Sequence, residues 1–139
     1  MKSFALISLF FIAFIQSNNV LQYWDNGVDI TCNITKIKVK DVSEKDRRIF
    51  AIKNNKQTWI FASLNLENQS DKVKIINLKN YCLSCQNRKS SETDIDSYID
   101  YIIMDKKLLP KEKFTAKVYW VFDGELLKND LDQIKLVKK

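Results

Sequence analysis

Two cysteines three positions apart are the residues whose spacing most directly suggests chemistry. Cys82 and Cys85 enclose Leu83 and Ser84 in a Cys-x-x-Cys motif. Thiol–disulfide oxidoreductases use this spacing, with the first sulfur at a helix N-terminus that stabilises the thiolate. Here the motif follows a predicted strand and enters a polar stretch without a clear helical pattern. A structural disulfide is therefore the first interpretation, and a thiol–disulfide redox protein using Cys82 and Cys85 is the alternative.

A third cysteine, Cys32, leaves the pairing open. One bridge at a time can form within the chain, as Cys82–Cys85, Cys32–Cys82 or Cys32–Cys85. Sequence alone does not fix this connectivity, and the local pair is our preferred choice. A bridge from Cys32 would close a loop of about fifty residues and would contribute about 4 kcal/mol in the chain-entropy account.

The sequence lacks the residues that other common catalytic and metal-binding sites require. The chain contains no histidine, which excludes the Ser-His-Asp and Cys-His arrangements and removes the commonest metal ligand. Asp94, Asp96 and Asp100 are candidate carboxylates by proximity only, and they lack the glycine and the spacing of a calcium loop. We therefore expect no catalytic residue, no cofactor and no metal site.

The N-terminal segment has the pattern of a secretory signal. A basic start, Met1-Lys2, precedes a run from position 4 to 15 that is apolar apart from Ser8. This run is shorter than the roughly 20 residues of a membrane-spanning helix. We expect a signal peptide over residues 1–17, a secreted or periplasmic location, and no stable membrane insertion after cleavage. Loss of Lys2 would lower the formal net charge from +6 to +5.

Regular alternation of apolar side chains predicts the strands that would position any site. Residues 114–123 alternate with three aromatic rings on one face, and residues 58–66 alternate in the same way. Asp123-Gly124 predicts a tight hairpin that returns along residues 125–127. The turn residues after position 67 predict a second hairpin over residues 58–78.

The remaining segments show a less regular alternation of apolar residues. We expect an irregular lead-in at 18–27, followed by one β-sandwich domain over 28–139. Residues 28–39 read as a strand with a bulge near Thr35-Lys36, and residues 41–47 as a charged loop. Residues 81–97 read as a long loop and a candidate contact surface. The run Tyr98 to Ile103 fits both helix and strand, and we favour strand. A final strand is expected around Ile134 and Leu136.

Two short motifs resemble parts of bacterial extracytoplasmic immunoglobulin-like domains. The run Leu108-Leu109-Pro110-Lys111-Glu112-Lys113-Phe114, before an aromatic strand, resembles the corner that precedes a late strand in that family, which usually has glycine where Lys111 stands. The run Leu64-x-Leu66-x-Asn68-x-Ser70 resembles the family's early hairpin. The resemblance covers about half of the chain after the leader. It implies an antiparallel two-sheet sandwich, immunoglobulin-like, and an interaction domain, and it carries over no active-site residue.

Basic and aromatic side chains are the candidate contact residues. Lysines at positions 36, 38 and 40 alternate along one predicted strand face, and a second basic cluster lies at 106–113. The sequence carries no nucleic-acid-binding motif, so we expect no nucleic-acid partner. The candidate interaction surface comprises Arg88, Lys89, Lys106, Lys107, Lys111, Trp59, Phe61 and Tyr119. The sequence thus predicts a small exported module that binds an unidentified protein partner without catalysis.

Overall fold

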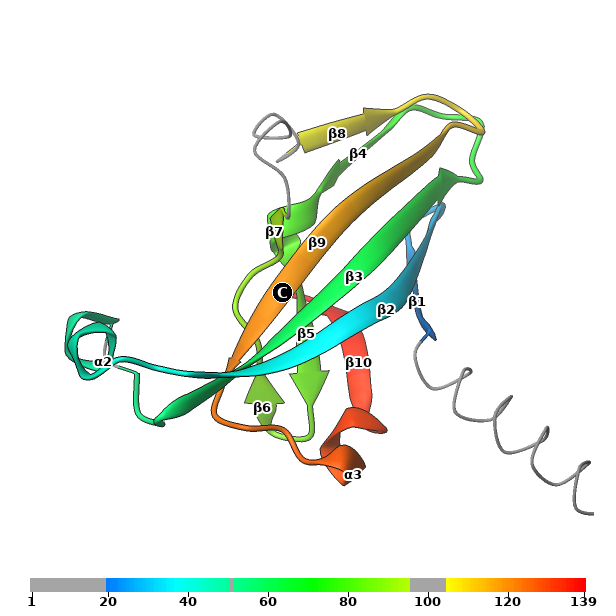
Figure 1. The fold of residues 1–139 in the computed structure, drawn as a ribbon. Helices are drawn as coiled ribbons and strands as arrows, with labels where there is room; N and C mark the ends of the chain where they lie inside the picture. Colours follow the sequence, from blue (N-terminus) through cyan, green and yellow to red (C-terminus); the bar gives the residue numbers. More distant parts are fainter. Residues whose placement is uncertain (1–19, 51, 96–104) are drawn as a thin grey trace, which may run out of the picture.

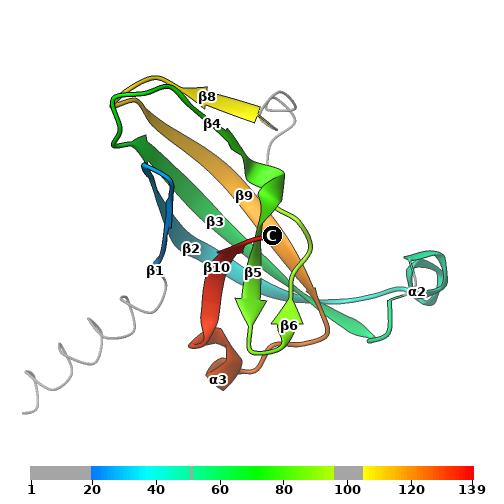
Figure 2. The same cartoon turned by 180° about the vertical axis from the view of Figure 1, so that it is seen from behind.

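The protein is an antiparallel β-sandwich in the computed structural model, which describes residues 20–50, 52–95 and 105–139 (Figure 1). The predicted signal peptide and the ambiguous run 98–103 lie outside these residues. One layer is a five-stranded sheet, and the other combines a three-stranded and a two-stranded sheet (Figure 2). The all-β, two-layer sandwich predicted from the sequence is confirmed.

The elements of each layer are as follows. The five-stranded sheet runs in the spatial order β1 (Val20–Asp25), β2 (Val28–Asp41), β3 (Lys56–Asn68), β9 (Lys113–Asp123) and β7 (Asp94–Ile95). The second layer holds β10 (Ile134–Lys138), β5 (Tyr81–Cys85) and β6 (Arg88–Lys89), beside the pair β4 (Lys74–Asn77) and β8 (Asp105–Leu108). The helical segments are α2 (Glu44–Phe50), η1 (Leu78–Asn80) and α3 (Lys128–Leu131).

The two predicted alternating strands, β3 and β9, form the centre of the five-stranded sheet. They pair antiparallel along most of their length, with Ile60 opposite Trp120 and Leu64 opposite Ala116. All four of these side chains are buried in the hydrophobic core. Period-two alternation places every second side chain on the same sheet face, so the neighbouring side chains must point away from the core.

A bulge in β2 keeps its apolar residues on the core side of the sheet. The register with β3 shifts between Ile34 and Lys36, as the sequence predicted. Beyond the bulge, Ile37 lies opposite Ile60 and Val39 opposite Thr58, both core-facing positions of β3. Ile37 and Val39 nevertheless remain 37% and 43% exposed. Figures 1 and 2 show this part of β2 and β3 extending past the second layer towards α2.

The predicted irregular lead-in at 18–27 is wrong, because it contains β1 and its turn. Val20–Asp25 pairs antiparallel with the start of β2. The connecting residues, Asn26 and Gly27, both have positive φ, at 46° and 96°. Asn-Gly tolerates these angles and is the strongest short-range hairpin signal in a sequence. The hairpin could therefore have been predicted.

Both predicted hairpins are wrong for the same reason: the chain leaves the five-stranded sheet and enters the other layer. After β3, strand β4 pairs with β8 rather than with β3. After β9, the chain continues through α3 to β10, which pairs with β5. The buried Thr58 hydroxyl stabilises the path of the chain from β9 into the second layer. It donates to the Gly124 carbonyl at 2.8 Å and accepts from the Leu126 N–H at 2.9 Å.

Two segments predicted as loops carry regular structure. The charged stretch at 41–47 belongs partly to α2, whose first turn is acidic and whose last turn is basic, as the helix dipole favours. The predicted loop at 81–97 contains β5, β6 and β7. Tyr81, Cys82 and Leu83 are consecutive and all nearly fully buried. A strand buried on both faces shows no alternation, so the expected period is absent from its sequence.

The corner that suggested the family resemblance is a tight turn between β8 and β9. The Glu112 N–H donates to the Leu109 carbonyl at 3.0 Å. Lys111 has φ of 64°, a left-handed conformation that glycine adopts at lower cost. Its Nζ donates to the Gln69 carbonyl at 2.7 Å, which ties this corner to the end of β3.

Asn68 holds this end of the sandwich together. Its side chain is fully buried, and Nδ2 donates to the carbonyls of Lys72, Leu108 and Leu109. Its Oδ1 accepts from Ser70 at 2.7 Å (Oγ) and 3.0 Å (N–H). One amide thus satisfies backbone groups of two separate segments, residues 70–72 and residues 108–109.

We expect Asn68→Ala to lower the free energy of unfolding by about 2–3 kcal/mol, because it leaves buried carbonyls without donors. Chemical denaturation followed by tryptophan fluorescence measures this loss. The matched control is Asn65→Ala on the same strand, whose partly exposed amide accepts one bond from Thr115. The control should change stability by less than about 0.5 kcal/mol. Equal losses in both variants would contradict the assigned role of Asn68.

Candidate functional site

Three aromatic side chains gather on the outer face of the five-stranded sheet, which points away from the second layer. Trp59 and Phe61 come from β3, and Tyr119, directly opposite Phe61, comes from β9. The Trp59 and Tyr119 rings stack at 5.2 Å between centroids and 17° between planes. Phe61 lies 6.3 Å from Trp59 and 5.8 Å from Tyr119. This aromatic cluster (Trp59, Phe61, Tyr119) is partly exposed.

Lysines of β2 flank the aromatic cluster on the same face. Lys36 lies opposite Phe61 and Lys38 opposite Trp59 in the strand register, and Lys40 follows. Lys40 Nζ lies 3.9 Å from the centroid of the Trp59 ring, and Lys36 Nζ lies 6.0 Å from that of Phe61. Such contacts are favourable because the negative face of the ring attracts the cation. We call these three exposed side chains the lysine row (Lys36, Lys38, Lys40).

Two carboxylates on this half of the face accept hydrogen bonds from other groups. Asp94 accepts from the Tyr119 hydroxyl at 2.8 Å. Asp123 accepts from two backbone N–H groups, of Lys53 and Asn54. Within residues 20–50, 52–95 and 105–139, neither Lys38 nor Lys40 forms an ion pair. This half of the face is therefore both aromatic and positively charged.

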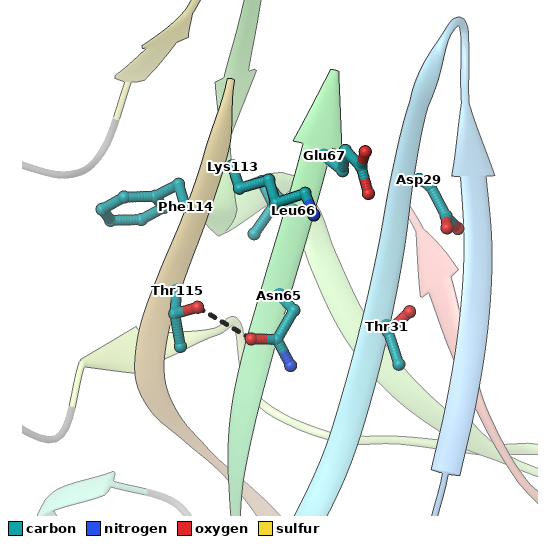
Figure 3. Close-up of a pocket in the computed structure, with 8 residues that line it drawn as sticks. All are labelled: Asp29, Thr31, Asn65, Leu66, Glu67, Lys113, Phe114 and Thr115. Atoms are coloured by element: carbon teal, nitrogen blue, oxygen red, sulfur yellow. Dashed lines mark hydrogen bonds between the residues drawn. The ribbon is translucent and has the colours of Figure 1, made fainter. Parts of the chain in front are cut away.

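The other half of the outer face is polar and forms a shallow pocket of about 230 Å³ (Figure 3). Asp29 and Glu67 lie opposite each other on neighbouring strands, and Lys113 lies opposite Glu67. Figure 3 draws the bond of 2.7 Å from the Thr115 hydroxyl to Asn65 Oδ1 across the pocket. In the described part of the chain, His, Cys, Asp and Glu side chains form no group of three that could hold a metal ion. The pocket offers hydrogen bonds and carries two carboxylates and one lysine.

The remaining predicted basic residues do not join the aromatic cluster. Arg88 donates to the Asp123 carbonyl, and Lys111 is bound at the β8–β9 corner. Lys106 Nζ lies 4.5 Å from the ring centroid of Phe114. Lys89 belongs to β6 and Lys107 to β8, both in the second layer. The structure thus brings together the three predicted aromatic residues and distributes the five predicted basic ones.

The alternation of Lys36, Lys38 and Lys40 in the sequence is a signal for the lysine row, although these residues are not among those of the predicted interaction surface. The sequence of one strand does not show which residues of the neighbouring strand lie beside it. The bulge at residue 35 shifts the register of β2 by one residue, and this shift brings Lys36 opposite Phe61. Pairing of the strands, rather than either strand alone, defines the surface.

The predicted disulfide is absent, because all three cysteines are free. Cys82 and Cys85 lie three positions apart on one strand, β5, so their side chains point to opposite faces. Cys32 lies on β2, in the other layer. Strand geometry therefore prevents the local bridge that we preferred.

The environment of the thiols opposes thiolate formation. Burial raises the pKa of Cys32 to about 12. The pKa of Cys85 is raised by burial and by the charge of Asp130, and its sulfur donates to the Asp130 carbonyl at 3.1 Å. Reactive cysteines instead occupy electropositive, accessible sites with a lowered pKa. Leu83, between the motif cysteines, is fully buried as well.

Comparisons with known proteins give distant likenesses only. The chain matches no family model and no curated protein. Among solved structures, it is similar to the yjhA protein from Bacillus subtilis, at 15% identity and a TM-score of 0.45, over 84% of this chain and 94% of that one. It is also similar to a functionally unknown protein from Listeria monocytogenes, at 17% identity and a TM-score of 0.43, over 80% of this chain and 65% of that one. Helices long and apolar enough to cross a membrane are not found in the described ranges.

The thiol assignment predicts a simple titration. Without reductant, we expect three titratable thiols in denaturant and slow labelling of all three in the native protein, because each sulfur is buried. A chromogenic thiol reagent measures both values. A count of one in denaturant would instead indicate a disulfide, and rapid native labelling of two thiols would indicate an accessible Cys82–Cys85 pair.

Proposed function

We propose that this protein is a small exported binding module without catalytic activity, which holds a protein partner on the outer face of its five-stranded sheet. The observation that carries the proposal is the aromatic cluster flanked by the lysine row. Tryptophan and tyrosine are enriched among the residues that dominate binding energy at protein interfaces. Stacking holds Trp59 and Tyr119 in place before binding, which reduces the entropy cost of ordering them.

A protein partner suits this surface better than a single-stranded nucleic acid. Nucleic-acid platforms present open ring faces on which bases stack. Here one face of Trp59 is directed towards Tyr119, and Lys40 also lies over this indole. The leader at 1–17, if it acts as a signal, also separates the mature chain from cellular nucleic acid. The pattern of this leader is what supports the proposed secreted or periplasmic location.

The proposed lack of catalytic activity rests on the residue types of the outer face and on the burial of the cysteines. The outer face carries aromatic, amide, hydroxyl, lysine and carboxylate side chains, and the chain has no histidine to act as a general base. The Cys82–Cys85 motif is the alternative reaction centre. Its buried sulfurs and the raised pKa of Cys85 are unfavourable for thiol–disulfide exchange. The geometry therefore favours binding over redox chemistry.

The experiment compares two tryptophans on the same outer face. Trp59→Ala should weaken capture of the specific partner from the extracytoplasmic fraction of the source cells by at least about tenfold, the loss typical of a strong interface residue. Trp24→Ala, at a 60% exposed position on β1, is the matched control and should change capture less than about twofold. Quantitative affinity measurements on the captured protein, with unfolding curves for both variants, provide the comparison. Equal effects of the two changes would contradict binding at the aromatic cluster.

A further inference from the structure

Strand β2 has one edge that is paired at its start and open at its end. Among the described residues, which begin at Val20, strand β1 pairs with this edge as far as Asn33, opposite Val20. On the opposite edge, β3 continues to pair with β2 as far as Asp41. Across the described ranges, no strand pairs with the first edge at residues 37–41, and Figures 1 and 2 show β2 here without a neighbour on that side. The backbone groups of such an edge can pair with an added strand. We call residues 37–41 the open edge.

The two faces of the open edge differ in chemistry. Lys38 and Lys40 are exposed on the outer face, beside the aromatic cluster. Ile37 and Val39 point to the inner face and are 37% and 43% exposed, although this face forms the core elsewhere in the sheet. The side chains of an added strand would alternate between the same two faces. Cross-strand neighbours of opposite charge attract each other, and apolar neighbours pack together.

We propose that the open edge binds an extended protein segment in which acidic residues alternate with aliphatic ones, adding it to the five-stranded sheet as a further strand. The acidic side chains lie beside Lys38 and Lys40, and the aliphatic ones cover Ile37 and Val39. Backbone hydrogen bonds supply affinity, and the alternation supplies specificity. This inference rests on the proposed function and names the chemistry of its partner.

A second copy of this chain does not fit the open edge. Antiparallel pairing of two such edges would place the lysines of one copy beside those of the other, and like charges opposite each other are destabilising. Lysine on an edge strand is a known obstacle to self-association. The same lysines attract an acidic strand, so they discriminate between a copy and the proposed partner.

The first test uses a capped peptide of alternating Glu and Val, seven residues long, with protein purified from cells expressing the full chain. We expect saturable binding and at least about tenfold slower hydrogen exchange at the amides of residues 37–41, because strand pairing protects these groups. A peptide of the same composition with its glutamates in one block is the first control. A peptide N-methylated on alternate amides is the second, because it keeps the side chains and loses backbone donors. Both controls should bind at least about tenfold more weakly.

The second test reverses the charges. The double variant Lys38→Glu and Lys40→Glu should bind the Glu/Val peptide at least about tenfold more weakly and gain affinity for a Lys/Val peptide. Lys117→Glu is the matched control, since Lys117 is exposed on the same face but belongs to β9. It should change the affinity by less than about twofold at physiological salt.

Several results would overturn the inference. They are peptide binding without protection of the open edge, equal affinity for the N-methylated peptide, and protection already present before peptide is added. The last would assign the edge to another segment of this chain or to a second copy. If the peptide fails to bind while partner capture still depends on Trp59, strand addition is wrong and the proposed function stands. If capture is also independent of Trp59, both fail.

Discussion

The buried indole of Trp120 is the contact on which the two-layer arrangement depends. This side chain is fully buried on β9, and its Nε1 donates to the Thr93 hydroxyl at 2.9 Å. Thr93 in turn donates to the Tyr81 carbonyl at 2.9 Å, on the central strand of the second layer. Leaving a buried polar atom without a partner would cost more free energy than one hydrogen bond contributes. These two linked hydrogen bonds therefore fix the depth and the orientation of the indole ring. At the edge of the layers, the Tyr81 hydroxyl donates to Asp25, which also pairs with Lys138.

The core dictates which side chains are left for binding. Because alternate residues of a strand point to opposite faces, burial of Ile60 and Val118 requires that Trp59, Phe61 and Tyr119 point outwards. Their stacking removes part of their apolar surface from water without a second layer. The outer face is thus aromatic at one end and polar at the other. Trp59 contacts Lys40, which the bulge in β2 places on the same face.

The sequence predicted those elements whose side chains alternate, and it failed where burial or pairing removed the alternation. Strands β3 and β9 have a clear alternation in the sequence, and a change in the alternation of β2 indicated its bulge. All three predictions are confirmed. Strand β5 is buried along nearly its whole length, so its apolar run lacked the period of a half-exposed strand. The two expected hairpins were predicted from turn residues alone. In the structure, Thr58 and Asn68 form hydrogen bonds with residues distant in the sequence, and these bonds stabilise the crossings into the other layer. For the candidate site, sequence identified the aromatic residues, while the register that adds the lysines is a property of the paired strands.

The exposed end of β2 follows from the unequal lengths of the layers. Strands β2 and β3 have 14 and 13 residues, whereas the strands of the second layer have two to five. The long strands therefore extend beyond their cover, and residues that continue the core pattern, Ile37 and Val39, reach solvent. Exposed aliphatic residues on an unpaired edge favour aggregation unless charge opposes it. Lys38 and Lys40 supply that charge while leaving the backbone edge intact, so the same residues that keep copies apart leave the edge open to an acidic strand.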